Sequence, residues 1–368
     1  MKPRSWKACL LLLALPALGA GDSAPAADQP FRVQEVRLTV KEETRPFDLL
    51  LTEKIDQIVT AKRFVAFRSG RGVWVKLEDT PIRRLEQLVE LPSGFDWYEH
   101  ACAAGDRLVV AVSVYPEDQR LREEETGMGG FRPGPQEVGF LVVDLRRRPG
   151  VRLLRTLHVT SRPDPGLGEE NEPIVPDPDV TLGMQSCVWD GDDLYVGDYG
   201  ALARVDLDAG TADLLEEDML AINRAALLKD GRDLWYSAYA DSPWMGKWTA
   251  RGSSSFDLLN EGAEADSLLK HRGRLLASTP SGVVEIDEKR RTWVRYRFAD
   301  AAAVYGLTLQ RRKLLGARDD GWVELDLSGK KAVRYRLEGP GADNRVLSIG
   351  FFDGDWYLGT VSGLVKVG

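Results

Sequence analysis

The chain of 368 residues lacks the residue types and motifs on which most enzymes depend. It contains three histidines, and none of them belongs to a zinc-binding helix motif. No serine stands in a nucleophile elbow, and no glycine-rich segment has the spacing of a phosphate loop. The sequence therefore gives little support for catalysis and favours a binding protein.

A net positive charge is also lacking. The 49 lysines and arginines are outnumbered by 57 aspartates and glutamates, which gives a formal net charge of −8. Removal of residues 1–20 would take away three bases and no acid, so the charge would become −11. Contact with phosphates needs a net basic footprint. The composition thus argues against a general nucleic-acid binder.

Long apolar runs are absent except at the N-terminus. Lys2, Arg4 and Lys7 precede an apolar stretch over residues 9–18, and small residues follow at 19–21. This pattern predicts a secretory signal peptide over residues 1–20, too short to span a membrane. We expect a soluble protein in the periplasm or secreted, with a flexible segment at 21–30 and one domain over 31–368.

What the sequence does contain is a repeat of about forty residues. An apolar strand opens at steps of 40, 41, 39 and 42 residues, at Leu194, Leu234, Leu275, Leu314 and Trp356. Seven residues after four of these openings stands a small residue, namely Ala201, Gly282, Gly321 and Gly363. Four short strands per repeat of this length are typical of a β-propeller blade. The fold class is therefore all-β.

Counting the repeats backwards predicts a seven-bladed propeller. The blades are expected to start near residues 52, 95, 181, 219, 263, 300 and 339. The last blade ends before its outer strand, and the alternating segment 31–40 has no blade of its own. We expect this N-terminal strand to close the ring by pairing with residues 364–367, which removes two exposed edges.

The last repeat resembles the propeller repeats of bacterial two-component-regulator sensor domains. The matching residues are Asn344–Ile349, then Asp353–Thr360, then Gly363–Val365. The resemblance implies a WD40-like, ligand-sensing propeller outside the cytoplasm. This chain has no kinase or DNA-binding region and no membrane span in its sequence, so a sensing role would need a separate partner.

Only Cys102 and Cys187 remain after signal-peptide removal. An exported compartment permits a disulfide. The two cysteines occupy equivalent places in successive repeats, which normally lie a blade-width apart, beyond the reach of a disulfide. We expect two separate buried thiols, with a disulfide as the alternative.

Both long insertions fall on one rim of the predicted propeller. We define the upper rim as the side of the d–a and b–c connections, and the lower rim as the side of the a–b and c–d hairpins. The insertions, residues 113–138 and 160–184, carry net charges of −3 and −5. They are expected to be either an acidic flap over the channel or solvated disordered excursions. A calcium site within them is a further hypothesis, although no calcium-loop motif is present.

A polar ring at the start of each innermost strand forms the candidate site. It fits a small polar ligand or a protein partner held by Arg224 and Arg345, whose planar guanidinium suits a carboxylate or phosphate. The candidate ligand-binding residues are Arg224, Arg345, Tyr305, His100, Asn223, Asp266, Asn344 and Trp244. Trp248, by contrast, is equally compatible with a core position. A polar ring is also expected in any wet channel.

The enzyme alternative is a calcium-dependent lactonase or hydrolase. Some propellers of that type hold one metal at the channel with acidic and amide side chains from different blades. The residues available for such a set are Glu99, Asn223, Asp266 and Asn344. This alternative depends on analogy of fold and not on a motif.

The lower rim is rich in bases. Six clusters of lysine and arginine lie in or beside its turns, among them residues 289–291 and 311–313. Any one cluster is ordinary solubilising charge. Together they predict contact with an anionic partner or lipid surface through this rim.

Overall fold

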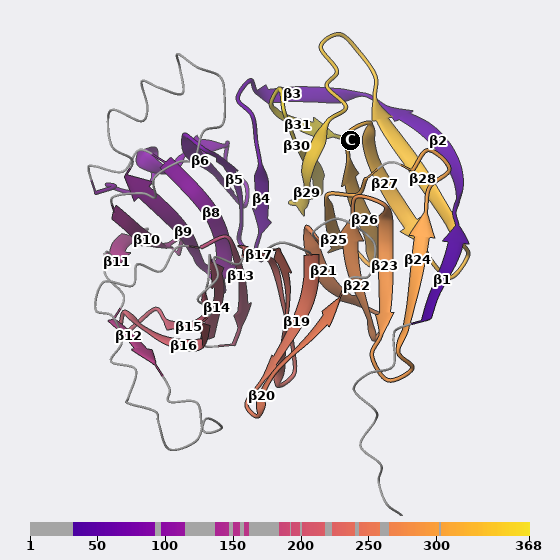
Figure 1. The fold of residues 1–368 in the computed structure, drawn as a ribbon. Coiled ribbons are helices and arrows are strands. Elements are labelled where there is room, and N and C mark those ends of the chain that lie inside the picture. The colour runs from indigo at the N-terminus through magenta and orange to yellow at the C-terminus, as the bar shows by residue number, and fades with distance from the viewer. Residues whose placement is uncertain are drawn as a thin grey trace, which may run out of the picture.

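The computed structural model describes residues 32–92, 97–114, 137–146, 150–154, 158–161, 184–191, 193–198, 201–217, 223–239, 243–257, 265–301 and 303–368. These residues form seven sheets, one for each blade (Figure 1). The innermost strand of every blade contacts those of the two neighbouring blades, and the seventh contacts the first. The predicted seven-bladed β-propeller is thus confirmed. Within the described residues, no helix has the length and apolarity that a membrane crossing requires.

The first four blades are built from consecutive strands. Blade 1 contains β4 (Gln57–Thr60), β5 (Phe64–Ser69), β6 (Gly72–Leu77) and β7 (Arg83–Arg84), followed by the 3-10 helix η1 (Leu85–Gln87). Blade 2 contains β8 (Trp97–Ala104), β9 (Arg107–Val114), β10 (Glu137–Asp144) and β11 (Gly150–Leu154). Blade 3 contains β13 (Ser186–Asp190), β14 (Asp193–Asp198), β15 (Ala201–Asp206) and β16 (Thr211–Glu217), with β12 (His158–Ser161) parallel to β16. Blade 4 contains β17 (Asn223–Asp230), β18 (Asp233–Tyr239), β19 (Pro243–Thr249) and β20 (Gly252–Asp257).

The last three blades take strands from both ends of the chain. Blade 5 contains β21 (Ser267–His271), β22 (Arg274–Thr279), β23 (Gly282–Asp287) and β24 (Thr292–Arg297). Blade 6 contains β25 (Gly306–Gln310), β26 (Lys313–Arg318), β27 (Gly321–Asp326) and β28 (Lys331–Leu337). Blade 7 contains β29 (Val346–Phe352), β30 (Asp355–Thr360) and β31 (Leu364–Val367). The N-terminal strands β1 (Arg32–Arg37), β2 (Thr39–Arg45) and β3 (Phe47–Leu51) add to these blades in turn.

The recurrent small residue at the start of the third strand has a steric cause. A side chain at Gly282 would collide with the carbonyl oxygen of Tyr296 on the outer strand, and one at Gly321 would collide with that of Tyr335. Both glycines also have φ near +130°, a region that side chains disfavour. A side chain at Gly363 would meet the carbonyl of Leu51. Leu51 therefore occupies in blade 7 the place of the outer-strand tyrosines.

The N-terminal segment closes the ring, but with different residues from those predicted. β3 pairs antiparallel with β31, with Phe47 opposite Val367 and Leu51 opposite Leu364, and so supplies the fourth strand of blade 7. The expected segment 31–40 lies elsewhere, because β1 pairs in parallel with β24 and β2 with β28. An alternating pattern identifies a strand without saying which edge it meets. Residues 47–51 lie close in sequence to blade 1, whereas 31–40 would leave a long connection.

β1 and β2 form a belt around the outside of blades 5 and 6, visible as the dark band at the right of Figure 1. Leu38 links the two strands and is only 3% exposed. It packs between the blades against Tyr296, Phe298 and other apolar side chains of the same core cluster. Burying a leucine contributes roughly 1.5–3 kcal/mol. The belt therefore joins two blades through their outer edges.

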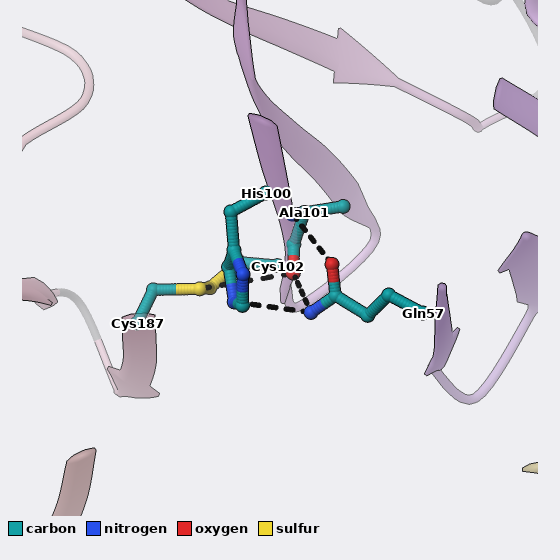
Figure 2. Close-up of a disulfide and its surroundings, with 5 residues drawn as sticks. All are labelled: Gln57, His100, Ala101, Cys102 and Cys187. Atoms are coloured by element: carbon teal, nitrogen blue, oxygen red, sulfur yellow. Dashed lines mark hydrogen bonds between the residues drawn. A yellow bond between two sulfur atoms is a disulfide. The ribbon is translucent and has the colours of Figure 1, made fainter. Parts of the chain in front are cut away.

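Cys102 and Cys187 form a disulfide, so the prediction of separate thiols is wrong (Figure 2). Cys102 lies on β8 and Cys187 on β13, the innermost strands of blades 2 and 3. Blades converge toward the channel, and at this radius the two Cα atoms are 6.3 Å apart. That separation is within the range of a disulfide. The blade-width argument holds only for the outer strands.

Candidate functional site

The structure describes only part of the upper channel mouth predicted from sequence. The side chains of Asn223, Arg224 and Trp244 lie outside the described residues, although their strands are included. The two acidic insertions also lie outside them except at their ends. Trp248 is a core residue. Its indole nitrogen donates to the Leu215 carbonyl at 3.0 Å, and the side chain packs against a buried cluster. Six ligand or metal candidates have described side chains, namely Glu99, His100, Asp266, Tyr305, Asn344 and Arg345.

His100 is held in a neutral form by the blade beside it. Gln57 of blade 1 pairs with the backbone of Ala101, accepting from its N–H and donating to its carbonyl, both at 2.9 Å (Figure 2). The same amide nitrogen lies 3.0 Å from His100 Nε2. An amide nitrogen can only donate, so Nε2 is the acceptor and carries no proton. Gln57 thus joins blades 1 and 2, and its amide engages Nε2 of His100, the nitrogen that could otherwise act as a base.

Burial and the nearby positive charge of Arg68 lower the pKa of His100 to about 3. Above pH 6.5 the histidine is neutral in the folded and unfolded chains, so it adds no pH dependence. Below pH 6.5 the unfolded chain binds a proton that the folded chain does not, and stability falls. We expect the free energy of unfolding to fall by about 2 kcal/mol more in the natural protein than in His100→Gln between pH 7 and pH 5. Urea unfolding at both pH values measures this, and equal losses would contradict it.

Two of the arginines near the upper rim make structural contacts within the protein. Arg68 donates to the Tyr98 carbonyl at 2.9 Å and lies 3.8 Å from the Asp56 carboxylate. Arg318 is fully buried, with its guanidinium 2.8 Å from Asp300 and 2.9 Å from Asp320. Neither arginine was predicted from the sequence. The available signal is an arginine at or next to the end of a mainly apolar second strand, as in β5 and β26.

Arg345, in contrast, presents its guanidinium to solvent. Its side chain is 58% exposed. Asp343 accepts hydrogen bonds from the Arg345 backbone N–H at 3.0 Å and from Nε at 3.4 Å. Ser362 in turn donates to the other oxygen of Asp343 at 2.7 Å. Within the described part of the chain, the two terminal nitrogens of Arg345 have no hydrogen-bond partner. The guanidinium is therefore held in place at Nε, and its two terminal nitrogens remain available to a ligand.

Tyr305 lies on the neighbouring blade and is held by an acidic group. Its hydroxyl donates to Asp319, and this hydrogen bond, together with burial and the charges of Asp319 and Asp266, raises the pKa of Tyr305 to about 12. The phenol therefore stays neutral. Its oxygen retains acceptor capacity for a ligand donor.

The candidate metal set does not come together among the described side chains. Asn344 accepts from the Leu337 N–H at 2.7 Å and so terminates β28. Glu99 accepts from Ser113 at 2.7 Å on its own blade. No group of three or more histidine, cysteine, aspartate or glutamate side chains with metal-binding geometry is present within the described ranges. Because the side chain of Asn223 lies outside the described part of the structure, the calcium alternative remains an untested prediction.

Comparison with known proteins gives no family and a clear fold. No family model and no curated protein matches the sequence. The extracellular domain of the one-component system BT4673 from B. thetaiotaomicron has a TM-score of 0.58 and 10% identity, over 87% of this chain and 39% of that chain. PorZ, a surface component of the type-IX secretion system of Porphyromonas gingivalis, has a TM-score of 0.52 and 12% identity, over 86% of this chain and 37% of that chain. YCF48 bound to D1 peptide has a TM-score of 0.56 and 10% identity, over 90% of this chain and 97% of that chain.

The likeness establishes the fold alone. The chain spans about two-fifths of the length of the BT4673 structure and of PorZ. The resemblance to sensor propellers, inferred from the last repeat, is confirmed at the level of a seven-bladed propeller. Identities of 10–12% carry no information on ligands or partners.

Proposed function

We propose that this protein is an exported, non-catalytic binding propeller whose site is the upper channel mouth at blades 6 and 7. Arg345 is its central residue and Tyr305 its neighbour. The ligand is a small polar molecule, or the end of a partner protein, that carries a carboxylate or phosphate. The open and positioned guanidinium of Arg345 is the observation that carries this proposal.

Arg345 is arranged as a binding residue would be. A flexible arginine loses side-chain entropy when it binds, about 1.5–2 kcal/mol. Asp343 and Ser362 reduce this cost because they hold Nε and the backbone before a ligand arrives. The free edge can donate two parallel hydrogen bonds to an anion. Arg68 and Arg318 lack such an exposed edge, since Arg68 donates to the Tyr98 carbonyl and Arg318 is fully buried between Asp300 and Asp320.

Export is supported by two independent features. The first is the signal-peptide pattern of residues 1–20. The second is the Cys102–Cys187 disulfide, because disulfides persist mainly in oxidising compartments. The YCF48 structure contains a bound peptide, which supports the capacity of this fold to bind polypeptides.

The site is tested by ligand-induced stabilisation. A panel of carboxylates, phosphate esters and peptides is screened by thermal shift on the natural protein. A ligand at one hundred times its dissociation constant stabilises by about 2.7 kcal/mol. We expect Arg345→Ala to abolish this shift. Arg345→Lys should retain part of it, because the positive charge remains while the pair of parallel hydrogen bonds from the guanidinium is lost.

The matched control is Arg71→Ala, an exposed arginine in the β5–β6 turn of the same rim. It should leave the shift unchanged. A ligand that stabilises the natural protein and Arg345→Ala equally would place the site elsewhere. The calcium alternative predicts instead that calcium alone raises the melting temperature of the natural protein.

A further inference from the structure

The turns of blades 5 and 6 form a concentrated positive surface on the lower rim, opposite the proposed site. Their four turn segments are 270–274, 287–291, 310–313 and 326–331. They contain eleven bases and three acids. We call the eleven bases the basic lower patch: Lys270, Arg272, Arg274, Lys289, Arg290, Arg291, Arg311, Arg312, Lys313, Lys330 and Lys331. All of them are exposed except Arg291, which is partly buried.

The nearby acids neutralise only part of this charge. Ion pairs engage Lys270, Arg274 and Lys313 at 2.5–2.9 Å and Arg290 at 3.7 Å. Asp326 accepts from the Gly329 N–H and so shapes its turn. Six members have no ion-pair partner among the residues that the structure describes: Arg272, Lys289, Arg311, Arg312, Lys330 and Lys331. The patch therefore retains a strong local positive potential.

The backbone of these turns is unfavourable for the residues found there. Arg311 and Arg312, the central pair of the β25–β26 hairpin, have φ of 49° and 65°. Arg272, Arg291 and Lys330 also have φ near +50°. Two-residue hairpins with positive φ favour Asn-Gly, and an arginine is disfavoured there because its Cβ crowds the following carbonyl oxygen. Turn formation alone would not select bases here.

Acids become more frequent beyond the patch. On one side, the turns of the adjoining blade 4, residues 229–233 and 249–252, contain two acids and three bases, and those of blade 3, residues 190–193 and 206–210, contain five acids and no base. On the other side, the blade 7 hairpin presents Asp353 and Asp355. A flat anionic membrane or a long nucleic acid laid on this rim would also meet those acids. A short anionic segment would meet mainly the eleven bases, which outnumber the three acids of the same turns.

We propose that the basic lower patch binds a short acidic polypeptide segment of a partner protein. Arg311 lies over the Phe351 ring, 4.1 Å from its centroid, so its charge is held at the edge of the patch. The other unpaired bases lie on neighbouring turns of two adjoining blades. Glutamate and aspartate side chains along an extended segment pair with several of them at once. This site is on the opposite rim from Arg345 and does not depend on the function proposed for it.

The test uses a fluorescein-labelled oligoglutamate peptide and fluorescence anisotropy at two salt concentrations. The main variant combines Arg272→Glu, Lys289→Glu, Arg312→Glu and Lys330→Glu. We expect it to weaken binding about tenfold or more, because four favourable charge interactions become repulsive. The control combines Lys62→Glu, Arg63→Glu, Arg232→Glu and Arg251→Glu on the lower turns of blades 1 and 4. It has the same net charge and should stay within about twofold.

A second variant separates binding from turn formation. Arg311→Asn with Arg312→Gly installs the favoured hairpin sequence and removes two charges. We expect an equal or higher melting temperature together with weaker peptide binding. Unchanged binding by this variant would overturn the role of the Arg311–Arg312 turn.

Three outcomes would overturn the proposal as a whole. Equal loss in both fourfold variants would indicate a response to net charge only. Absence of oligoglutamate binding at low salt would remove the site. Tighter binding of phosphatidylglycerol vesicles or of a DNA oligonucleotide, with the same dependence on the main variant, would assign the patch to a lipid or nucleic acid.

Discussion

Deleting residues 32–51 is expected to abolish cooperative folding, whereas deleting residues 32–45 should leave a closed but weakened ring. The longer deletion removes β3, so β31 becomes an exposed edge and blades 7 and 1 lose their join. Its cost should exceed about 5 kcal/mol, comparable with the whole stability of an ordinary domain. The shorter deletion spares β3 and removes Leu38, whose burial contributes roughly 1.5–3 kcal/mol. Thermal unfolding followed by circular dichroism measures both.

The pair of deletions separates ring closure from the outer belt. Size-exclusion chromatography adds a second readout, since uncovered strand edges promote association. Both deletions expose the edges of β24 and β28, and only the longer one opens blade 7. Similar melting temperatures for the two proteins would show that β3 does not close the ring.

Replacing both cysteines, Cys102→Ala with Cys187→Ala, should lower the free energy of unfolding by about 4 kcal/mol. The disulfide spans 85 positions in sequence, and cross-linking a segment of that length restricts the unfolded chain strongly. It also joins blades 2 and 3 on either side of the insertion at residues 160–184. Urea unfolding with and without reductant measures the difference.

The reductant provides the matched control. The natural protein should lose stability on reduction to the level of the double variant, and the double variant should not respond. Intact mass after alkylation without reduction should be two hydrogens below that of the reduced, unalkylated chain. Alkylation of both cysteines in unreduced, denatured protein would contradict the disulfide.

The sequence alone determined the number of blades and the repeated strands within them, but not the strands that the N-terminal segment adds. The spacing from Leu194 to Trp356 reflects hairpin chemistry and a close approach of strands that every blade repeats. Gly321 is small because the Tyr335 carbonyl lies where its side chain would be, and each blade imposes that constraint within a few dozen residues. Because every blade has the same local requirements, the residues that meet them recur in the sequence at a fixed spacing.

The candidate site was only partly accessible to sequence reasoning. Arg345 precedes the innermost strand β29, which is why the sequence suggested it, and its role in binding stays a prediction. The sequence did not distinguish it from Arg68, which donates to the Tyr98 carbonyl of the next blade, or from Arg318, which is buried against the carboxylates of Asp300 and Asp320. His100 was a candidate for binding, and the Gln57 amide from the next blade decides its protonation. For Arg68 and His100 the distinction depends on a group from the neighbouring blade, and for Arg318 it depends on how the loops that carry Asp300 and Asp320 fold back onto it.

Tertiary structure alone decided which distant segments meet. The alternation of residues 31–40 specified a strand, but the pairing of Arg32 with Thr292 and of Phe47 with Val367 depends on the complete ring. The two cysteines had equivalent positions in their repeats, and the convergence of blades at the channel brought their Cα atoms within 6.3 Å. Periodicity records the contacts that every blade repeats. Contacts made once, across the ring closure or between two particular blades, have no period and appear only when the chain is folded.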